Sequence, residues 1–228
     1  MALRAQELIE SPPHLHGFDA AGRPESWALS PETLRLLDDA IEPGSRTLET
    51  GAGVSTVLFA LREADHVCVA PAEDEVRRIR EFCAANGIST ERVSFVVERS
   101  ELALPRFEPT ALDLVLIDGS HSFPNVFIDW HYTAARLRLG GLLFVDDINL
   151  WTPRVLHDFL REDPSWALDA EVPMRSAVFR KQLAVDGAAN WTEQPFVVAR
   201  SHLTRGSRAM AMLRQGQLRT LLRRLRPR

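Results

Sequence analysis

Acidic and histidine side chains follow two apolar segments of the chain, at spacings that would let them act together. Asp118 ends the apolar run LDLVLID and is followed three residues later by His121, while Asp146 and Asp147 end the run GLLFVDD. Such runs are typical of central strands in a parallel sheet, whose carboxyl ends meet along one edge. Three carboxylates gathered there would repel one another, and Mg²⁺ or Mn²⁺ would relieve the repulsion. The pattern predicts a metal site at Asp118, Asp146 and Asp147, with His121 beside it as a candidate base, because imidazole can take up a proton at neutral pH.

The same residues also have plainer structural interpretations. A carboxylate just after a strand often caps a helix or forms a turn, which applies to Asp147. His121 could cap the helix expected over residues 123–137 or bond a carboxylate. Asp129 lies on that helix, where a solvated acid or a supporting partner is at least as typical as a direct role. His14 and His16, near the N-terminus, could form part of a lid, although solvated loop histidines are the more common case.

A glycine-rich turn follows the first expected strand. The segment LETGAGVST places Gly51 and Gly53 between a strand over 46–50 and a helix over 54–63. Glycines there let the backbone approach a ligand, and the free N–H groups of the helix start can face it. A dinucleotide-binding fingerprint needs a third glycine or alanine, and Thr56 occupies that position. The pattern therefore disfavours a nicotinamide-dependent oxidoreductase.

Strand and helix patterns alternate along the chain. Further strands are expected over 66–70, 93–98, 112–118 and 141–147, with helices over 30–41, 72–85, 123–137 and 151–160. Two late strands, over 166–171 and 176–181, are close enough to form a hairpin-like pair at one edge, with one strand antiparallel. The prediction is an α/β fold: a Rossmann-like, doubly wound, mostly parallel sheet of about seven strands with helices on both faces.

Composition sets the domain organisation. The 228 residues, 45% apolar and 25% charged, are ordinary for a globular chain with one main domain. We expect an N-terminal arm or cap over 1–29, the main domain over 30–182, an extension over 183–199 and a basic tail over 200–228. The tail holds nine arginines and no acid, whereas residues 1–199 hold 18 basic and 31 acidic residues, a net charge of −13. Leucines among the tail's arginines suggest a basic amphipathic helix whose partner is unknown; a solvated helix is the alternative.

The sequences ETGAGVS after strand one, IDGSH after strand four and FVDD after strand five resemble those of class I S-adenosylmethionine-dependent methyltransferases. Within that superfamily the chain looks like the metal-dependent bacterial small-molecule O-methyltransferases of the cephalosporin and macrolide-sugar type. The resemblance covers residues 27–182. It implies S-adenosylmethionine as cofactor, with Ser55 bonded to the cofactor's carboxylate. The implied cofactor-binding residues are Glu49, Thr50, Gly51, Gly53, Ser55, Thr56, Arg99, Ser100 and Asp118.

The chain departs from that family at two positions. Relatives carry an acid at the end of strand two that binds the ribose hydroxyls, whereas this strand ends in Ala70 and Pro71, with Glu73 beyond. The usual acid near the adenine amino group is replaced by Arg99, with Ser100 beside it. Ribose and adenine recognition must therefore differ here.

These observations together predict an S-adenosylmethionine-dependent O-methyltransferase that acts on a hydroxyl of a small natural product or sugar with the help of a divalent metal. The alternatives are a metal-independent methyltransferase and a degenerate methyltransferase fold that serves as a scaffold. No apolar run is long enough to span a bilayer, and the N-terminus lacks the apolar core of a signal peptide, so we expect a cytoplasmic protein. Specific nucleic-acid binding is not expected, because no aromatic residues are interleaved with the tail's arginines. A homodimer is expected from family habit.

Overall fold

The computed structural model describes residues 3–17, 21, 23, 27–108, 110–184, 190–202, 205–214 and 216. The chain divides into two compact units, Met1–Gly187 and Ala188–Arg228. Among the described residues no helix is both long and apolar enough to cross a membrane. The larger unit contains the sheet and every predicted site residue.

Seven strands form one sheet in the order β3-β2-β1-β4-β5-β7-β6. The chain order reverses beside β1, which pairs in parallel with both β2 and β4. Open sheets of this kind bind ligands outside the carboxyl ends of the strands at such a reversal. The strands are β1 (Arg46–Thr50), β2 (Asp65–Val69), β3 (Val93–Val96), β4 (Leu112–Ile117), β5 (Leu137–Val145), β6 (Trp166–Val172) and β7 (Ser176–Lys181).

The two late strands confirm the predicted hairpin-like edge. β7 lies between β5 and β6 and runs antiparallel to both, so it is the one reversed strand of the sheet. The predicted doubly wound, mostly parallel α/β fold is therefore confirmed. β5 begins earlier than expected, at Leu137 rather than residue 141, and its pairing with β4 shifts register between Leu112 and Leu114.

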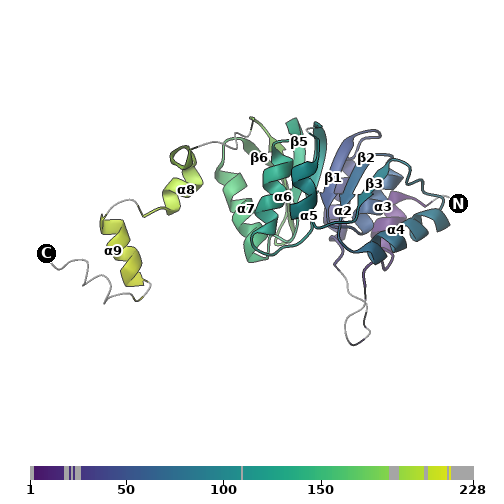
Figure 1. Ribbon diagram of the computed structural model, residues 1–228, viewed down its shortest axis with the longest axis horizontal. Helices are drawn as coiled ribbons and strands as arrows, with labels where there is room; N and C mark the ends of the chain where they lie inside the picture. The colour runs from purple at the N-terminus through teal and green to yellow at the C-terminus, as the bar shows by residue number, and fades with distance from the viewer. Residues whose placement is uncertain are drawn as a thin grey trace. The chain divides into compact units, whose positions relative to one another are not determined.

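Helices cover both faces of the sheet (Figure 1). One core cluster joins α1 (Ala5–Glu10), α2 (Pro31–Ala40), α3 (Val54–Leu61) and α4 (Glu73–Ala85) to the sheet. The second core cluster joins four other helical segments to the sheet: the short α5 (Ser100–Ala103), η1 (Leu104–Arg106), α6 (Asn125–Ala134) and α7 (Trp151–Glu162). α2 starts as the sequence predicts: the Ser30 hydroxyl accepts a hydrogen bond from the Thr33 amide, and Pro31 occupies the first turn.

The N-terminal segment is more ordered than the irregular arm that the sequence suggested. It contains helix α1, and Leu8, Ile9 and Leu15 are almost fully buried in the same core cluster as α3. Three apolar side chains were too few to reveal helical periodicity in a segment rich in Pro, Gly and His. The segment therefore stabilises the domain that it covers.

Lys181, the chain's one lysine, is buried at the end of β7. Its ammonium group donates hydrogen bonds to the carbonyl oxygens of Ala134 and Leu137, 2.7 and 2.6 Å away. Burial lowers the pKa of this amine. Lys181 thus links the end of α6 to the start of β5.

The smaller unit contains η2 (Trp191–Glu193), α8 (Pro195–Arg200) and α9 (Arg205–Arg214). α9 carries the start of the predicted basic helix, with Met210 and Leu213 exposed. The remaining leucines of that prediction, at positions 218, 221, 222 and 225, lie outside the described residues.

Candidate active site

A cavity of about 530 Å³ opens at the carboxyl ends of β1, β2, β4 and β5. This volume lies in the usual range for small-molecule sites. Five of the predicted cofactor-binding residues line it: Thr50, Gly51, Arg99, Ser100 and Asp118. The predicted base, His121, and the predicted metal ligand Asp147 line it as well. These predicted residues therefore share one cavity at the carboxyl edge of the sheet.

The turn after β1 requires glycine at position 51. Gly51 has φ +98°, and a Cβ there would overlap the carbonyl oxygen of Asp118. Its amide donates to the Val69 carbonyl at 3.0 Å, while the Asp118 amide donates to the Thr50 carbonyl at 3.1 Å. The ends of β1, β2 and β4 are thereby held close together around the cavity floor.

Glu49 points into the protein, not into the cavity. Its side chain is buried and accepts hydrogen bonds from the hydroxyls of Ser55, at 2.7 Å, and Thr56. His66 Nε2 lies 3.1 Å from the same carboxylate. Three residues of the predicted cofactor set, Glu49, Ser55 and Thr56, thus fasten the start of α3 to β1 from beneath the turn. Gly53, at the start of α3, is covered by the ring of His16.

Two further buried side chains, His66 and Cys68, support this turn, although no sequence pattern singled them out. His66 stacks on Phe59 with 4.0 Å between ring centroids, and its Nδ1 lies 2.8 Å from the Thr47 hydroxyl. The Cys68 thiol donates to the Gly51 carbonyl at 3.4 Å. Burial raises the pKa of Cys68 well above its usual value, so the sulfur keeps its proton. The glycine turn at Gly51 therefore rests on a cluster of buried polar side chains.

His121 lies between two carboxylates on the cavity wall. Its Nε2 is 3.3 Å from Asp147 Oδ2 and 3.8 Å from Asp118 Oδ1. Asp147 has φ +51°, a left-handed conformation that places its side chain on the cavity side. Burial, followed by repulsion from Asp146, Glu49 and Asp147, raises the pKa of Asp118 well above its usual value. The predicted acidic cluster around His121 therefore contains two of its three carboxylates, Asp118 and Asp147.

Asp146 does not join that cluster. It is buried, accepts a hydrogen bond from the Ser176 hydroxyl, and does not line the cavity. Ser176 in turn lies 2.6 Å from the Thr33 hydroxyl of α2. Among the described residues no three His, Cys, Asp or Glu side chains are arranged to hold a metal ion. The predicted three-carboxylate site is not formed, because the Ser176 hydroxyl holds Asp146 outside the cavity that Asp118 and Asp147 line.

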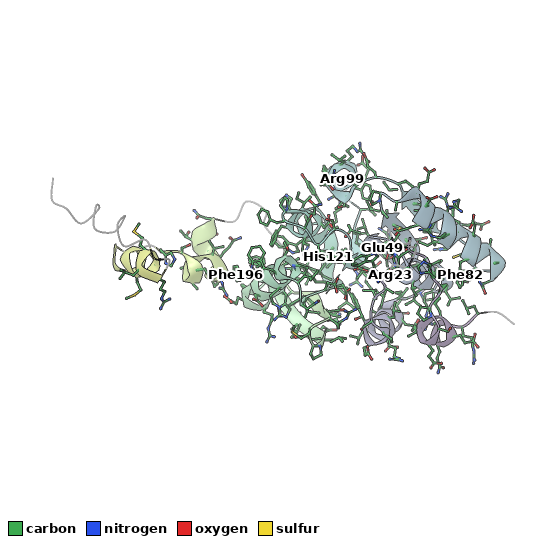
Figure 2. The ribbon with its side chains drawn as sticks, turned by 90° about the horizontal axis from the view of Figure 1, so that it is seen from below. Arg23, Glu49, Phe82, Arg99, His121 and Phe196 are labelled. Atoms are coloured by element: carbon green, nitrogen blue, oxygen red, sulfur yellow. The ribbon has the colours of Figure 1, made fainter. Side chains whose placement is uncertain are left out.

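Arg99 on the cavity wall is exposed, whereas Asp129 of α6 is buried and does not line the cavity. Arg99 forms an ion pair with Glu101 and lies near the outer margin of the molecule in Figure 2. Asp129 of α6 is fully buried, and neither of its oxygens has a hydrogen-bond partner of normal geometry. Burial raises its pKa to about 6, an effect that the nearby hydroxyls of Ser100 and Thr50 oppose. The solvated-acid interpretation of Asp129 is therefore wrong.

The N-terminal segment also contributes to the cavity. His16 is buried, with 8% of its surface exposed, and its Nδ1 lies 3.3 Å from Glu75 Oε1. Both residues line the cavity, as does the exposed Trp27. The solvated-loop interpretation is thus wrong for His16, while His14 is exposed. Contacts so distant in sequence leave no local pattern from which to predict them.

Comparisons with known proteins bear on this geometry. Residues 48–148 match the model of a family described as a methyltransferase domain. This part of the chain therefore carries the sequence pattern of a methyltransferase domain. The matched residues include the glycine turn, Asp118, His121 and both aspartates after β5. No curated protein matches the sequence.

Solved structures share the fold at low sequence identity. The O-methyltransferase TomG from Streptomyces achromogenes, solved with S-adenosylmethionine, is 17% identical over 80% of this chain and 91% of its own, with a TM-score of 0.60. The cofactor-bound protein Rv0187 from MTB is 21% identical over 78% and 86%, with a TM-score of 0.56. An rRNA methylase from Streptococcus thermophilus is 14% identical over 65% and 93%, with a TM-score of 0.51. Such identities establish the methyltransferase fold and leave the acceptor open.

Proposed function

We propose that this enzyme transfers a methyl group from S-adenosylmethionine to a hydroxyl oxygen of a small molecule. The observation that carries the proposal is His121, whose ring lies in the cavity wall with Nε2 facing Asp147 and Asp118. Oxygen nucleophiles need a base when they attack a methyl sulfonium, and imidazole is the commonest one at neutral pH. A histidine between two acids suits that task.

The bound cofactor supplies an electrophilic methyl group. The chain's own residues orient the two reactants and accept the proton. Methyl transfer requires oxygen, carbon and sulfur in line, so the rigid turn at Gly51 contributes by fixing one reactant. His121 takes the hydroxyl proton, and the carboxylate of Asp147, 3.3 Å from Nε2, stabilises the imidazolium that forms.

A small acceptor is favoured over a nucleic acid. The cavity has the dimensions of a small-molecule site, and the exposed Trp27 on its wall offers an apolar contact. Residues 1–199 carry a net charge of −13, which would repel a polyanion. The likeness to an rRNA methylase concerns the fold alone and does not outweigh this charge.

A divalent metal remains a hypothesis from the sequence. Burial, together with repulsion from neighbouring carboxylates, raises the pKa of Asp118, and a cation would relieve that repulsion, but Asp146 would have to leave Ser176 before three carboxylates could converge. We therefore assign no step to a metal. The expected homodimer and the cytoplasmic location likewise stay predictions.

The proposal is tested first by titrating the purified protein with S-adenosylhomocysteine in a calorimeter. We expect micromolar binding, followed by methyl transfer from labelled S-adenosylmethionine to members of a panel of hydroxylated small molecules. His121→Asn should bind S-adenosylhomocysteine as the native protein does and lose transfer. Transfer to ribosomal RNA but to no small molecule would overturn the acceptor class, while transfer unaffected by His121→Asn would overturn the base.

A further inference from the structure

The end of β2 lacks the carboxylate that would bind the ribose hydroxyls of the cofactor. Ala70 and Pro71 line the cavity there, and neither side chain can accept a hydrogen bond. Three acids follow at the start of α4: Glu73, Asp74 and Glu75. Of these only Glu75 lines the active-site cavity.

Glu75 is held in place by the N-terminal segment. His16 Nδ1 lies 3.3 Å from Glu75 Oε1, and this contact engages one of the two carboxylate oxygens. One turn along α4, the Arg78 guanidinium donates to the Leu15 carbonyl at 2.6 Å. The Leu15 side chain is buried in the core. The residue before His16 is therefore held both by its carbonyl hydrogen bond and by its side chain.

His16 also contacts the cofactor turn. A Cβ on Gly53 would lie 3.3 Å from His16 Cε1 and 3.4 Å from His16 Nε2, so the ring packs directly on that glycine. The imidazole therefore joins the start of α3 to the carboxylate on α4. Glu75 consequently faces the cavity in a fixed position relative to the glycine turn.

We propose that Glu75 binds the ribose hydroxyls of S-adenosylmethionine in place of the acid missing at Ala70, and that His16 is its positioning residue. The inference rests on the cofactor assignment given above. A carboxylate accepts hydrogen bonds from two neighbouring hydroxyls through its two oxygens, and such charge-assisted bonds are stronger than neutral ones. The acid is thus supplied by a helix and fixed by the N-terminal segment.

Calorimetry with two ligands tests the role of Glu75. S-adenosylhomocysteine carries both ribose hydroxyls, and its 2′,3′-dideoxy analogue carries neither. We expect Glu75→Gln to weaken binding of S-adenosylhomocysteine about tenfold and to leave binding of the analogue unchanged. Glu73→Gln is the matched control, because Glu73 starts the same helix but does not line the cavity, and it should change neither affinity.

Two variants of His16 separate positioning from packing. In His16→Asn the side-chain amide can donate from nearly the same place as Nδ1, whereas His16→Leu fills similar space without a donor. We expect His16→Asn to bind S-adenosylhomocysteine nearly as the native protein does. His16→Leu should bind S-adenosylhomocysteine more weakly and bind the dideoxy analogue with unchanged affinity. In the double variant His16→Leu/Glu75→Gln, the affinity for S-adenosylhomocysteine should be little lower than in Glu75→Gln alone.

The outcomes distinguish this inference from the cofactor assignment. If the native protein fails to bind S-adenosylhomocysteine, the cofactor assignment falls and the inference with it. If the native protein binds it but Glu75→Gln weakens both ligands equally, or neither, the cofactor stands and the ribose role of Glu75 is overturned. Equal losses in His16→Asn and His16→Leu would overturn the positioning role.

Discussion

His121 Nε2 lies 3.3 Å from Asp147 Oδ2, and the positive φ of Asp147 keeps that carboxylate on the cavity side. A substitution that removes the ring should therefore affect the chemical step more than cofactor binding. We expect His121→Asn to lower kcat by roughly 10²- to 10⁴-fold, the usual contribution of a general base, while the Kd for S-adenosylhomocysteine changes less than about twofold. His131→Asn is the control, since His131 is exposed on α6. Steady-state kinetics and calorimetry on the two variants decide the matter, and a parallel loss of binding would contradict the assignment.

Gly51 and Gly87 form a matched pair for testing the cofactor turn. Both have positive φ, but a Cβ on Gly51 would overlap the Asp118 carbonyl, whereas a Cβ on Gly87 would meet nothing within 4 Å. Gly87→Ala should lower the free energy of unfolding by about 1–2 kcal/mol, the cost of a left-handed backbone alone. Gly51→Ala should cost more than that and abolish binding of S-adenosylhomocysteine. Urea unfolding and calorimetry measure both effects, and similar costs for the two variants would contradict the close approach.

Asp129 should make the stability of the native protein depend on pH. Burial raises its pKa to about 6 in the folded state, above the value in the unfolded chain. The folded state therefore favours the protonated acid, and the free energy of unfolding falls as pH rises from about 4 to about 6. Asp129→Asn removes the ionised form and should stabilise the protein at pH 7.5 by on the order of 2–3 kcal/mol, with a smaller gain at pH 4.5. Urea unfolding at both pH values measures the free energy of unfolding of the native protein and of Asp129→Asn. An increase in the variant that does not depend on pH would contradict the raised pKa of Asp129 as its cause.

The position of Asp146 predicts weak binding of metal by the protein alone. Its hydrogen bond from Ser176 keeps it out of the cavity that Asp118 and Asp147 line. Without acceptor we expect Mg²⁺ to bind with a Kd above about 1 mM, so that 1 mM Mg²⁺ stabilises the fold by less than about 0.4 kcal/mol. Thermal unfolding with and without Mg²⁺, alongside Asp118→Asn, measures this. Submicromolar binding that Asp118→Asn removes would mean that the three carboxylates do converge.

The sequence predicted the edge of the sheet better than the direction of its side chains. Alternating apolar runs placed Gly51, Asp118 and His121 at one cavity because strand ends in a parallel sheet share an edge. The same reasoning put Glu49 and Asp146 there, although both point inward to hydroxyl partners, Glu49 to Ser55 and Thr56 and Asp146 to Ser176. Which face a side chain takes at a strand end depends on the partners that it meets in the folded chain, six and seven residues away for Glu49 and 30 residues away for Asp146.

The contributions of the N-terminal segment could not be predicted for a related reason. His16 reaches Glu75 across 59 positions, and Leu15 accepts from Arg78 across 63. Neither pairing follows a helical or strand period, so only the folded chain brings the residues together. Hydrophobic periodicity indicates local structure and says little about which distant segments meet.

Lys181 gives the protein an unusual reactivity toward amine-directed reagents. Because the chain's one lysine is buried with its amine bonded to two carbonyl oxygens, no lysine amine of the native fold is open to acylating dyes or crosslinkers. Acylation of Lys181 would therefore report the opening of β7, which makes the residue a built-in probe of unfolding. For the same reason a surface lysine introduced by mutation would be the single side-chain attachment point on the native protein.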